Sequence, residues 1–490
     1  MLLHDLIKGF DPRIRLDRLP NLPVHGVTED SRLVAPGDLF VARNGTRTDG
    51  QIFLADARRR GAIAAVLGRS DPACELPQVH VDDPAAAASR LANLLAGEPS
   101  RALSVLGVTG TNGKTTTAYL LRHLLGKAHL QCGLIGTVEI DDGRRQREAS
   151  MTTPSATEIA QLLAAMRDNG CGACAMEVSS HALDQGRVAG VRFAAAAFTN
   201  LTGDHLDYHK SMDNYAAAKA RLFQLLDSGA GAIVNADDPA GARMVKHCRA
   251  KIIRFGIRAQ AEYRATDVNV TSHGTRFVLT APDGSAPVSM SLIGKHNVEN
   301  ALAAAALAAQ GCGISVAQIA SGLSDAAGAP GRLQVVRAGQ PFAVLVDYAH
   351  TDDALENVLT ALRPLTNGSL RVLFGCGGDR DRSKRPRMAA VAQRLADVVY
   401  VSSDNPRTEM PLAIITDIVA GFSADFRSKV RVEPDRRTAI ELLLAEAKAG
   451  DVVLIAGKGH ENYQIVGTAK HHFDDVEEAT RVLSAKTRAA

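Results

Sequence analysis

The chain has 490 residues, enough for two to four domains of ordinary size. Hydrophobic residues make up 46% and charged residues 22%, which is typical of a soluble protein with a large core. The net charge of +3 excludes the clustered basic excess of a nucleic-acid-binding protein. The sequence has neither an apolar run of about 18 residues nor a signal-peptide pattern at its start, so we expect no membrane partner.

Seven cysteines are scattered along the chain, several of them in apolar, strand-like runs. This distribution is typical of reduced, buried thiols and predicts a cytoplasmic protein. Cys171 and Cys174 form a CxxC pair, but a structural zinc site needs a second pair, and the sequence has none at suitable spacing. We therefore expect no metal or redox role for that pair.

Two short stretches have the composition of linkers. They read GEPS at 97–100 and DAAGAPGR at 325–332. They divide the chain into 1–100, 101–332 and 333–490, each close to the size of a typical domain.

Strand-like and helix-like runs alternate along most of the chain. The first block contains a strand-like run at 37–42 and a helix-like run at 85–96. The other two blocks contain more strands, at 103–109, 172–178, 193–199, 231–236, 342–348, 370–376, 396–402 and 451–457, with helix-like runs such as 214–226 between them. This alternation predicts an α/β fold with parallel sheets covered by helices.

The stretch GVTGTNGKTTTAYLL, residues 107–121, joins a buried strand to an amphipathic helix through a glycine-rich turn. This layout predicts a phosphate-binding loop, in which Lys114 contacts the β- and γ-phosphates and the Thr115 hydroxyl contacts Mg2+. The spacing departs from G-x4-G-K-[ST], because the first glycine would stand at Val108. The alternative is an ordinary surface turn.

Polar clusters follow six of the expected strands. They begin at Glu177, Asn200, Asp347, Gly375, Ser402 and Gly457. Ligands of open parallel sheets gather beyond the carboxyl ends of the strands, so we expect these clusters to line one cleft. Each could also be a turn with incidental polar residues. The basic run DRDRSKRPR at 379–387 is interrupted by aspartates, which favours a site for anions over a charged tail.

Ten short motifs occur along the chain in the order in which the Mur ligases of peptidoglycan synthesis have them, and the sequence resembles that family. They are GTNGKTT, EVSSHAL, NLTGDHLDYH, NYAAAKARLF, HNVENALAA, PGRLQVV, VDYAHTDDALE, GCGGDRDRSKRP, SDNPRTE and GKGHE. The resemblance is strongest to the members that add the third peptide residue. It implies an N-terminal UDP-sugar-binding domain, a central ATPase domain with a doubly wound, mostly parallel sheet, and a C-terminal Rossmann-like domain. It also implies an ATP-dependent ligase that adds meso-2,6-diaminopimelate to UDP-N-acetylmuramoyl-L-alanyl-D-glutamate through an acyl phosphate, with Mg2+, as a monomer.

The resemblance assigns roles to individual residues on the ATP side. The phosphates would be held by Gly110, Thr111, Asn112, Gly113, Lys114, Thr115 and Thr116. Glu177 would share the first Mg2+ with Thr115, and His205 would bind a second Mg2+. Lys219 would carry a carbamate formed with CO2 and supply oxygens to the metal. The remaining ATP contacts would come from Asn297, Asn300, Arg332 and Asp347, while His350 would help to order a loop.

The other two substrates have implied contacts as well. For the UDP-sugar-peptide these are Ser31, Thr46, Arg47, Thr48, Thr152, Thr153, Ser179, Gln185 and Arg187. Met151 stands where the family has a polar residue, so its side chain would make no amide contact. For diaminopimelate they are Arg380, Asp404, Asn405, Pro406, Arg407, Gly457 and Glu461, since a guanidinium group suits the additional carboxylate.

Several alternatives remain open from the sequence. An L-lysine-adding ligase or a folylpolyglutamate-synthetase-like ligase would share the architecture. A P-loop kinase, a switch ATPase or a nucleotide sensor would share only the loop. Taken alone, Lys219 and Glu177 read as solvated side chains, Asn300 as a helix-surface amide and 404–407 as an Asn-Pro turn.

Overall fold

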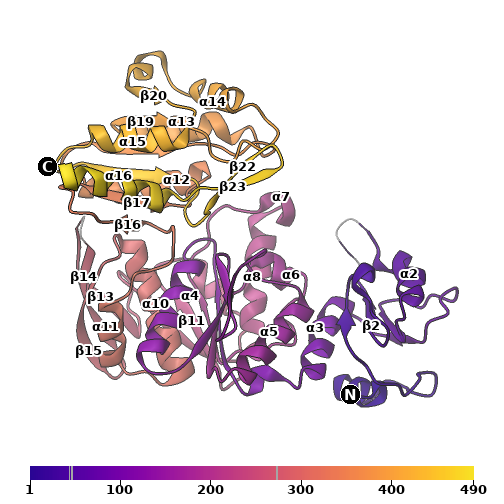
Figure 1. Cartoon of the computed structure of the whole chain (residues 1–490). Helices are drawn as coiled ribbons and strands as arrows, with labels where there is room; N and C mark the ends of the chain where they lie inside the picture. Colours follow the sequence, from indigo (N-terminus) through magenta and orange to yellow (C-terminus); the bar gives the residue numbers. More distant parts are fainter. Residues whose placement is uncertain (44, 46–47, 272–273, 490) are drawn as a thin grey trace. The chain divides into compact units, whose positions relative to one another are not determined.

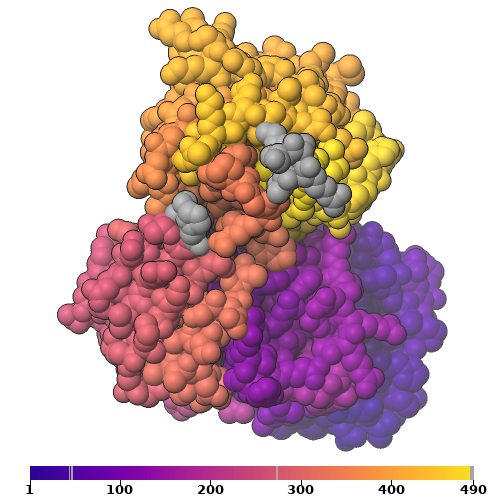
Figure 2. All heavy atoms as spheres, turned by 60° about the vertical axis from the view of Figure 1, so that its left-hand side comes forward, coloured from indigo at the N-terminus to yellow at the C-terminus, as the bar shows by residue number. Residues whose placement is uncertain are grey.

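The computed structural model describes residues 1–43, 45, 48–271 and 274–489 (Figure 1). The chain divides into two compact units. Unit 1 comprises Met1–Ala265, Leu279–Ala286 and Glu299–Gly322, and unit 2 comprises Thr266–Val278, Pro287–Val298 and Leu323–Ala490. Figure 2 shows the outer face of the molecule with all heavy atoms drawn as spheres.

A four-stranded parallel sheet forms the N-terminal part of unit 1. Its elements are α1 (Leu3–Phe10), β1 (Val27–Thr28), β2 (Leu39–Ala42), α2 (Leu54–Arg59), β3 (Ala64–Leu67), β4 (Gln78–His80) and α3 (Pro84–Leu95). The strand order is β1-β2-β3-β4, and every pair is parallel. The short apolar strands β2 and β3 are buried throughout, as expected where both faces of a parallel sheet are covered.

The central sheet has 11 strands in the order β15-β14-β13-β12-β11-β10-β5-β9-β6-β7-β8. Pairing is parallel from β13 to β6 and antiparallel from β6 to β8. The strands are β5 (Ser104–Thr109), β6 (Cys132–Ile135), β7 (Glu139–Asp141), β8 (Gln146–Glu148), β9 (Ala173–Glu177), β10 (Ala195–Phe198), β11 (Gly231–Asn235), β12 (Lys251–Gly256), β13 (Tyr263–Thr271), β14 (Gly274–Ala281) and β15 (Gly284–Met290).

Eight described helices belong to the same part of the chain as this sheet. They are α4 (Lys114–Lys127), α5 (Ala156–Asp168), α6 (Ser180–Asp184), α7 (Leu206–His209), α8 (Met212–Gln224), α9 (Gly241–Met244), α10 (Lys295–Cys312) and α11 (Val316–Ser324). Ala118, Leu121 and Leu125, whose spacing predicts the buried face of a helix, are all buried in α4. Val108 pairs with Glu177 and Phe198 with Thr109, so β5, β9 and β10 end side by side.

Unit 2 contains a six-stranded sheet in the order β16-β17-β21-β18-β19-β20, in which only β16 is antiparallel to its neighbour. Its elements are β16 (Gln334–Val336), β17 (Ala343–Asp347), α12 (Asp352–Leu362), β18 (Leu370–Phe374), α13 (Lys384–Leu395), β19 (Val398–Val401), α14 (Pro411–Val419), β20 (Val430–Val432), α15 (Arg436–Glu446), β21 (Val452–Ala456), the hairpin β22 (Tyr463–Val466) and β23 (Ala469–His472), and α16 (Asp475–Ala489). The expected α/β class with mostly parallel sheets is confirmed.

All seven cysteines are unpaired, and Cys132, Cys171, Cys174 and Cys376 are buried. Thiols packed among apolar side chains behave as small hydrophobic groups. Within the described part of the chain, no helix has both the length and the hydropathy needed to cross a bilayer.

Candidate functional site: a phosphate loop in unit 1 and an acid–amide–lysine cluster in unit 2

The glycine-rich loop between β5 and α4 has a backbone that only glycine accommodates at two positions. Gly110 has φ 150° and Gly113 has φ 85°. A Cβ at Gly110 would collide with the side chain of Thr199, and one at Gly113 would collide with Asn300. The usual motif would have glycine at position 108, where this chain has valine. Gly110 instead lets the loop turn close to its neighbours.

Two lysines donate to the same carbonyl oxygen in this loop. Lys114 Nζ lies 2.9 Å and Lys219 Nζ 2.7 Å from the oxygen of Gly110. Lys114 also donates to the oxygen of Thr111 over 2.8 Å. The end of β5 therefore gathers two lysine amino groups where a helix begins, and the start of a helix suits an anionic ligand.

Lys219 is buried in α8 with 1% of its surface exposed, which overturns the reading of this residue as a solvated lysine. Burial lowers its pKa well below the usual value, and the neighbouring Lys114 lowers it further. The ring of Tyr215 lies 4.3 Å from Lys219 Nζ, and its hydroxyl shares a 3.2 Å hydrogen bond with Thr111. Tyr215 thus connects the lysine to the loop, a role that the sequence analysis missed.

Glu177, the last residue of β9, is fully buried and faces the start of α4. Its Oε2 accepts from the Thr115 hydroxyl over 3.0 Å. Thr137 also donates to Glu177 with its backbone N over 2.8 Å and its hydroxyl over 3.0 Å. A buried carboxylate and a hydroxyl in contact offer the hard oxygen ligands that Mg2+ prefers.

His205 follows β10 in a left-handed conformation with φ 54°. Burial lowers its pKa, and among the charges that act on the ring are those of Lys114 and Lys219. Its ring centroid lies 4.8 Å from that of His181. Within the described residues, no group of three or more His, Cys, Asp or Glu side chains could hold a metal ion. A metal here would therefore draw on hydroxyl or substrate oxygens as well.

Both asparagines assigned to ATP binding are buried in α10. Asn300 accepts from the Thr117 hydroxyl over 3.4 Å, which places it against α4 in unit 1. Asn297 belongs to unit 2, where its Nδ2 donates to Ile293 over 2.9 Å. The reading of Asn300 as a surface amide is therefore wrong.

The residues assigned to the UDP-sugar-peptide form a polar network around Arg187 in unit 1. Arg187 donates to the oxygen of Thr153 over 2.8 Å and to Gln185 Oε1 over 2.7 Å. Its Nη1 also lies 3.7 Å from the sulfur of Met151. Thr153 donates to Ser179 over 3.3 Å, and Thr152 shares a 3.1 Å hydrogen bond with Thr137.

The remaining assignments of this group lie in the N-terminal part of unit 1. Ser31 is buried at the start of a short 3-10 helix, whereas Thr48 is exposed. Thr46 and Arg47 lie outside the described residues. Sequence analysis did not single out Glu29 and Arg43, which form a 3.2 Å ion pair. Burial raises the pKa of Glu29, and the charges of Arg43 and Arg187 oppose that rise.

Arg332 and Asp347 come together in unit 2. Both oxygens of Asp347 accept backbone N–H groups, from Leu333 over 2.7 Å and from Ala349 over 2.8 Å. The guanidinium of Arg332 lies 4.8 Å from the centre of the Tyr348 ring, and the ring of His460 lies 4.9 Å from it. Among the described residues, Arg332 Nε and His460 Nδ1 are buried atoms without a hydrogen-bond partner, so each could contact a ligand.

The DNPR segment, residues 404–407, lies between two other motifs of unit 2 and the β22–β23 hairpin. Arg407, with φ 51°, donates through Nη1 to the oxygen of Gly378 over 2.9 Å, and its backbone pairs with the hairpin. A Cβ at Gly378 would collide with Pro406. The segment is therefore packed against the GCGGD loop and is not a free Asn-Pro turn.

Asp404, Asn405 and Glu461 surround a lysine that the sequence analysis missed. Lys458 has no exposed side-chain surface, and its Nζ lies 3.5 Å from Asp404 Oδ1. Glu461 Oε2 accepts from Asn405 Nδ2 over 2.8 Å. A lysine between two glycines gives no periodicity, so only its place just after a strand could have indicated it. The other two assigned residues are Gly457, whose N donates to Asp347, and the exposed Arg380.

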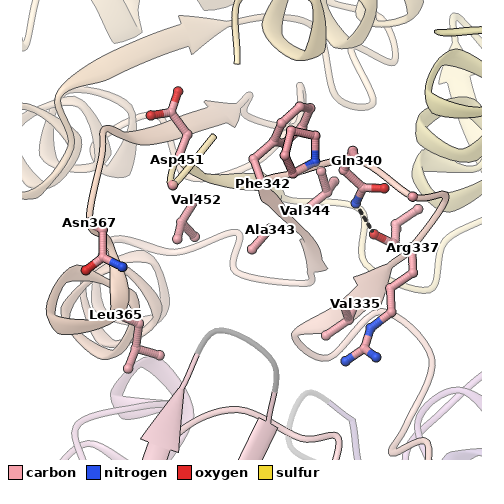
Figure 3. A pocket seen from close by; sticks show the side chains of 14 residues that line it. Val335, Arg337, Gln340, Phe342, Ala343, Val344, Leu365, Asn367, Asp451 and Val452 are labelled. Carbon is pink, nitrogen blue, oxygen red and sulfur yellow. Dashed lines mark hydrogen bonds between the residues drawn. The ribbon is translucent and has the colours of Figure 1, made fainter. Parts of the chain in front are cut away.

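A cavity of about 350 Å³ lies at the amino-terminal ends of strands β17 and β21 in the six-stranded sheet of unit 2 (Figure 3). Ala343 and Val452, the first residues of β17 and β21, line it together with Phe342 and Asp451. The motif residues Asp347 and Gly457 stand at the carboxyl ends of the same strands. Because ligands of such sheets bind at the carboxyl ends, we do not assign this cavity to the candidate site.

Comparisons with known proteins agree with this arrangement. Three family models match the chain: the Mur ligase family catalytic domain at residues 23–95, the Mur ligase middle domain at 108–308 and the Mur ligase glutamate ligase domain at 331–459. A UDP-N-acetylmuramoyl-L-alanyl-D-glutamate–2,6-diaminopimelate ligase of Gloeobacter violaceus is 46% identical over 491 residues, covering 99% of each chain. The enzyme of that name from Geobacter sulfurreducens is 44% identical and covers 98% of each.

A solved structure also has this fold. It is titled as a UDP-N-acetylmuramoyl-L-alanyl-D-glutamate–2,6-diaminopimelate ligase and is 34% identical, with a TM-score of 0.74 and coverage of 98% of this chain and 99% of the other. Identity at this level over almost the entire length, together with the three family models, leaves no ambiguity about kinship. This chain belongs to the Mur ligase family.

Proposed function

We propose that the chain is an ATP-dependent ligase that joins meso-2,6-diaminopimelate to UDP-N-acetylmuramoyl-L-alanyl-D-glutamate. The observation that carries this proposal is the presence of both the phosphate loop of unit 1 and the DNPR cluster of unit 2 in a chain whose relatives bear that activity in their names. A carboxylate is a poor acyl donor, so the γ-phosphoryl group of ATP is first transferred to the D-glutamate side-chain carboxylate. The amine of diaminopimelate then attacks the acyl phosphate, forming the amide and releasing phosphate.

Two anions must approach each other in the first step, and cationic groups at the end of β5 would stabilise them. We assign Lys114 to the γ-phosphate and Thr111, Asn112 and Thr116 to the remaining phosphate contacts. Gly113 caps the start of α4, where unpaired backbone N–H groups and the helix dipole both favour an anion. Charge that develops on the transferring phosphoryl group is stabilised most by groups that are already in place.

The residues present fit Mg2+. Thr115 and Glu177 would hold the first ion, and His205 with the modified Lys219 would hold a second. When bound, the ion neutralises charge on the phosphates and on the attacking carboxylate. The same carboxylate of Glu177 is fixed by Thr137, so it is oriented before any ligand arrives.

Lys219 is proposed to react with CO2. The neutral amine forms the N–C bond and releases a proton to water, which leaves a carbamate. The lowered pKa of this buried lysine supports the proposal, because only the unprotonated amine is nucleophilic. The carbamate would replace a buried ammonium by a group with two hard oxygens, which suits Mg2+.

In unit 2, the additional carboxylate of diaminopimelate would meet the guanidinium group of Arg407, and Arg380 would bind the other carboxylate. Asp404, Asn405, Pro406, Gly457 and Glu461 would form the rest of the amino-acid site. In unit 1, the network around Arg187 and Thr153 would hold the UDP-sugar-peptide. We also propose domain limits of 1–100, 101–332 and 333–490 and a monomeric enzyme. We place the enzyme in the cytoplasm, a location that the seven unpaired cysteines support.

The test measures phosphate release and product mass with ATP, Mg2+ and all pairs of the other substrates. A ligase releases phosphate only when the UDP-dipeptide and the amino acid are both present, whereas a kinase or switch ATPase needs at most one of them. We expect a product mass equal to the UDP-tripeptide with diaminopimelate. A preference for L-lysine would overturn the substrate assignment, and phosphate release without the amino acid would overturn the reaction.

A further inference from the structure

Lys458 is a charged residue at a place where packing alone does not require charge. Its side chain has no exposed surface. The Nζ atom lies 3.3 Å from Asn405 Oδ1, 3.5 Å from Asp404 Oδ1 and 3.6 Å from Glu461 Oε2. Burying an ammonium group is costly, and apolar residues of similar volume often replace buried ion pairs without loss of stability. The retained charge therefore calls for a role beyond packing.

The position of Lys458 determines which end of the Asn405 amide faces Glu461. Asn405 Oδ1 accepts from Lys458 Nζ and from the backbone N of Ile465 over 2.9 Å. Two donors on this side leave the amide nitrogen for the other side, where it donates to Glu461 Oε2 over 2.8 Å. Without Lys458, one of the two donors that fix the amide is lost.

Lys458 also separates two carboxyl groups. Asp404 and Glu461 are both nearly buried, with 10% and 16% of their side chains exposed. Burial and the charge of Asp404 raise the pKa of Glu461, and Lys458 opposes that rise. Lys458 is also the cation that contributes most to the lowered pKa of Asp404. Loss of the ammonium would favour a neutral Glu461 and a rearranged pair.

We propose that Lys458 is a positioning residue for the incoming amino acid, which rests on the proposed function. It holds Asp404, Asn405 and Glu461 in the arrangement that receives the ammonium group at the far end of diaminopimelate. Asp404 and Glu461 supply two carboxyl groups against the one ammonium of Lys458, so this cluster can also accept an ammonium group of the substrate. The lysine itself does not touch the reacting atoms.

The experiment compares the full-length wild type with Lys458→Met, Lys458→Arg and a matched control, Lys470→Met. Lys470 lies on the exposed strand β23 and also packs against Tyr463, so the control makes the same chemical change beside the cluster. For each variant, kcat and the KM values for diaminopimelate, ATP and the UDP-dipeptide are measured, together with thermal unfolding. We expect Lys458→Met to raise the KM for diaminopimelate by about 10- to 100-fold.

The other parameters distinguish positioning from a general structural role. The KM values for ATP and the UDP-dipeptide should stay within about threefold of wild type, and Lys458→Arg should recover most of the loss, because it keeps the charge. An unchanged KM for diaminopimelate, or a parallel rise of all three KM values, would overturn the proposal. A chain that folds only with lysine at 458 would assign the residue to stability and overturn it as well. If wild type does not use diaminopimelate, the proposed function fails instead.

Discussion

Two lysine side chains donate to the same backbone oxygen in the phosphate loop. Lys114 and Lys219 both donate to Gly110, yet they differ in surroundings. Lys114 opens α4 and can follow a phosphate, whereas Lys219 lies buried between the loop and the ring of Tyr215. Burial lowers the pKa of Lys219, and the nearby Lys114 lowers it further, so Lys219 gives up its proton more readily than an exposed lysine.

Replacing Lys114 by alanine should lower kcat by about 100- to 1,000-fold, because a positioned cation is lost where charge develops in the transition state. Binding of the UDP-dipeptide should change little, since its proposed contacts are elsewhere in unit 1. Steady-state kinetics and titration calorimetry measure the two quantities. Lys127→Ala, an exposed change at the other end of the same helix, is the control. Near-normal turnover in Lys114→Ala would refute the assignment.

Replacing Arg407 by alanine should reduce the preference for diaminopimelate over lysine by about 10- to 150-fold, since a hydrogen bond to a charged group contributes about 1.5–3 kcal/mol. The measurement is the ratio of the two kcat/KM values in wild type and variant. Arg431→Ala, an exposed arginine on β20, is the control. If the variant keeps the ratio of the wild type, another residue discriminates between the two amino acids.

At the scale of elements, the turns decide where the side chains meet. Parallel strands β5, β9 and β10 end side by side, so the loop, Glu177 and the segment from Asn200 to His205 converge without long connections. Asn200 closes this arrangement, because its backbone oxygen and side chain both bind the loop, at Thr111 over 2.8 Å and at Asn112 over 2.9 Å.

Gly113→Ala tests the loop-to-helix junction. The new methyl group would collide with Asn300 and would sit on a residue with φ 85°, a conformation that costs an L-residue about 1–2 kcal/mol. We expect the ATP affinity to fall at least about tenfold. Gly126→Ala is the matched control, because it lies in the last turn of α4 and the new group meets no atom of another segment within 4 Å. That change should leave ATP binding intact and raise stability by about 0.5–1 kcal/mol. Equal ATP affinities in the two variants would contradict the argument.

At the scale of the whole molecule, the sequence predicted the order of elements well, because buried parallel strands are short apolar runs that stand out between polar loops. The strands expected at 172–178, 193–199 and 231–236 correspond to β9, β10 and β11 within one or two residues at each end. It did not predict the β22–β23 hairpin, whose residues are mostly polar or exposed. Lys458 was missed for a related reason, since two of the partners that surround it, Asp404 and Asn405, lie more than 50 residues away in the sequence.

Stability of the entire chain should depend on pH through Glu299, in unit 1. Burial, together with the charges of Asp237 and Asp238, raises its pKa from 4.5 to about 7, whereas Arg258 opposes the rise. The folded protein then binds more protons than the unfolded chain between about pH 4.5 and 7. Stability from this group is therefore fully present below about pH 4.5 and is lost as the pH rises through 7, by about 3 kcal/mol in total.

The measurement is the urea midpoint at pH 5 and at pH 8. The decrease between the two should be smaller in Glu299→Gln than in wild type, because glutamine has no proton to lose. Glu262→Gln, at a more exposed carboxyl group, should keep the wild-type decrease. The same decrease in Glu299→Gln as in wild type would show that other groups cause it.

Gly331 and Gly459 touch, since a Cβ on the first would collide with the backbone of the second. These two residues are also the limits of the glutamate ligase family model. The segment between them therefore begins and ends at the same place in the fold. Such a segment can be exchanged as one cassette with little strain on the backbone at its two junctions. In a chimaera with another family member, both splice junctions would fall at a single contact, so one compensating change could repair them together.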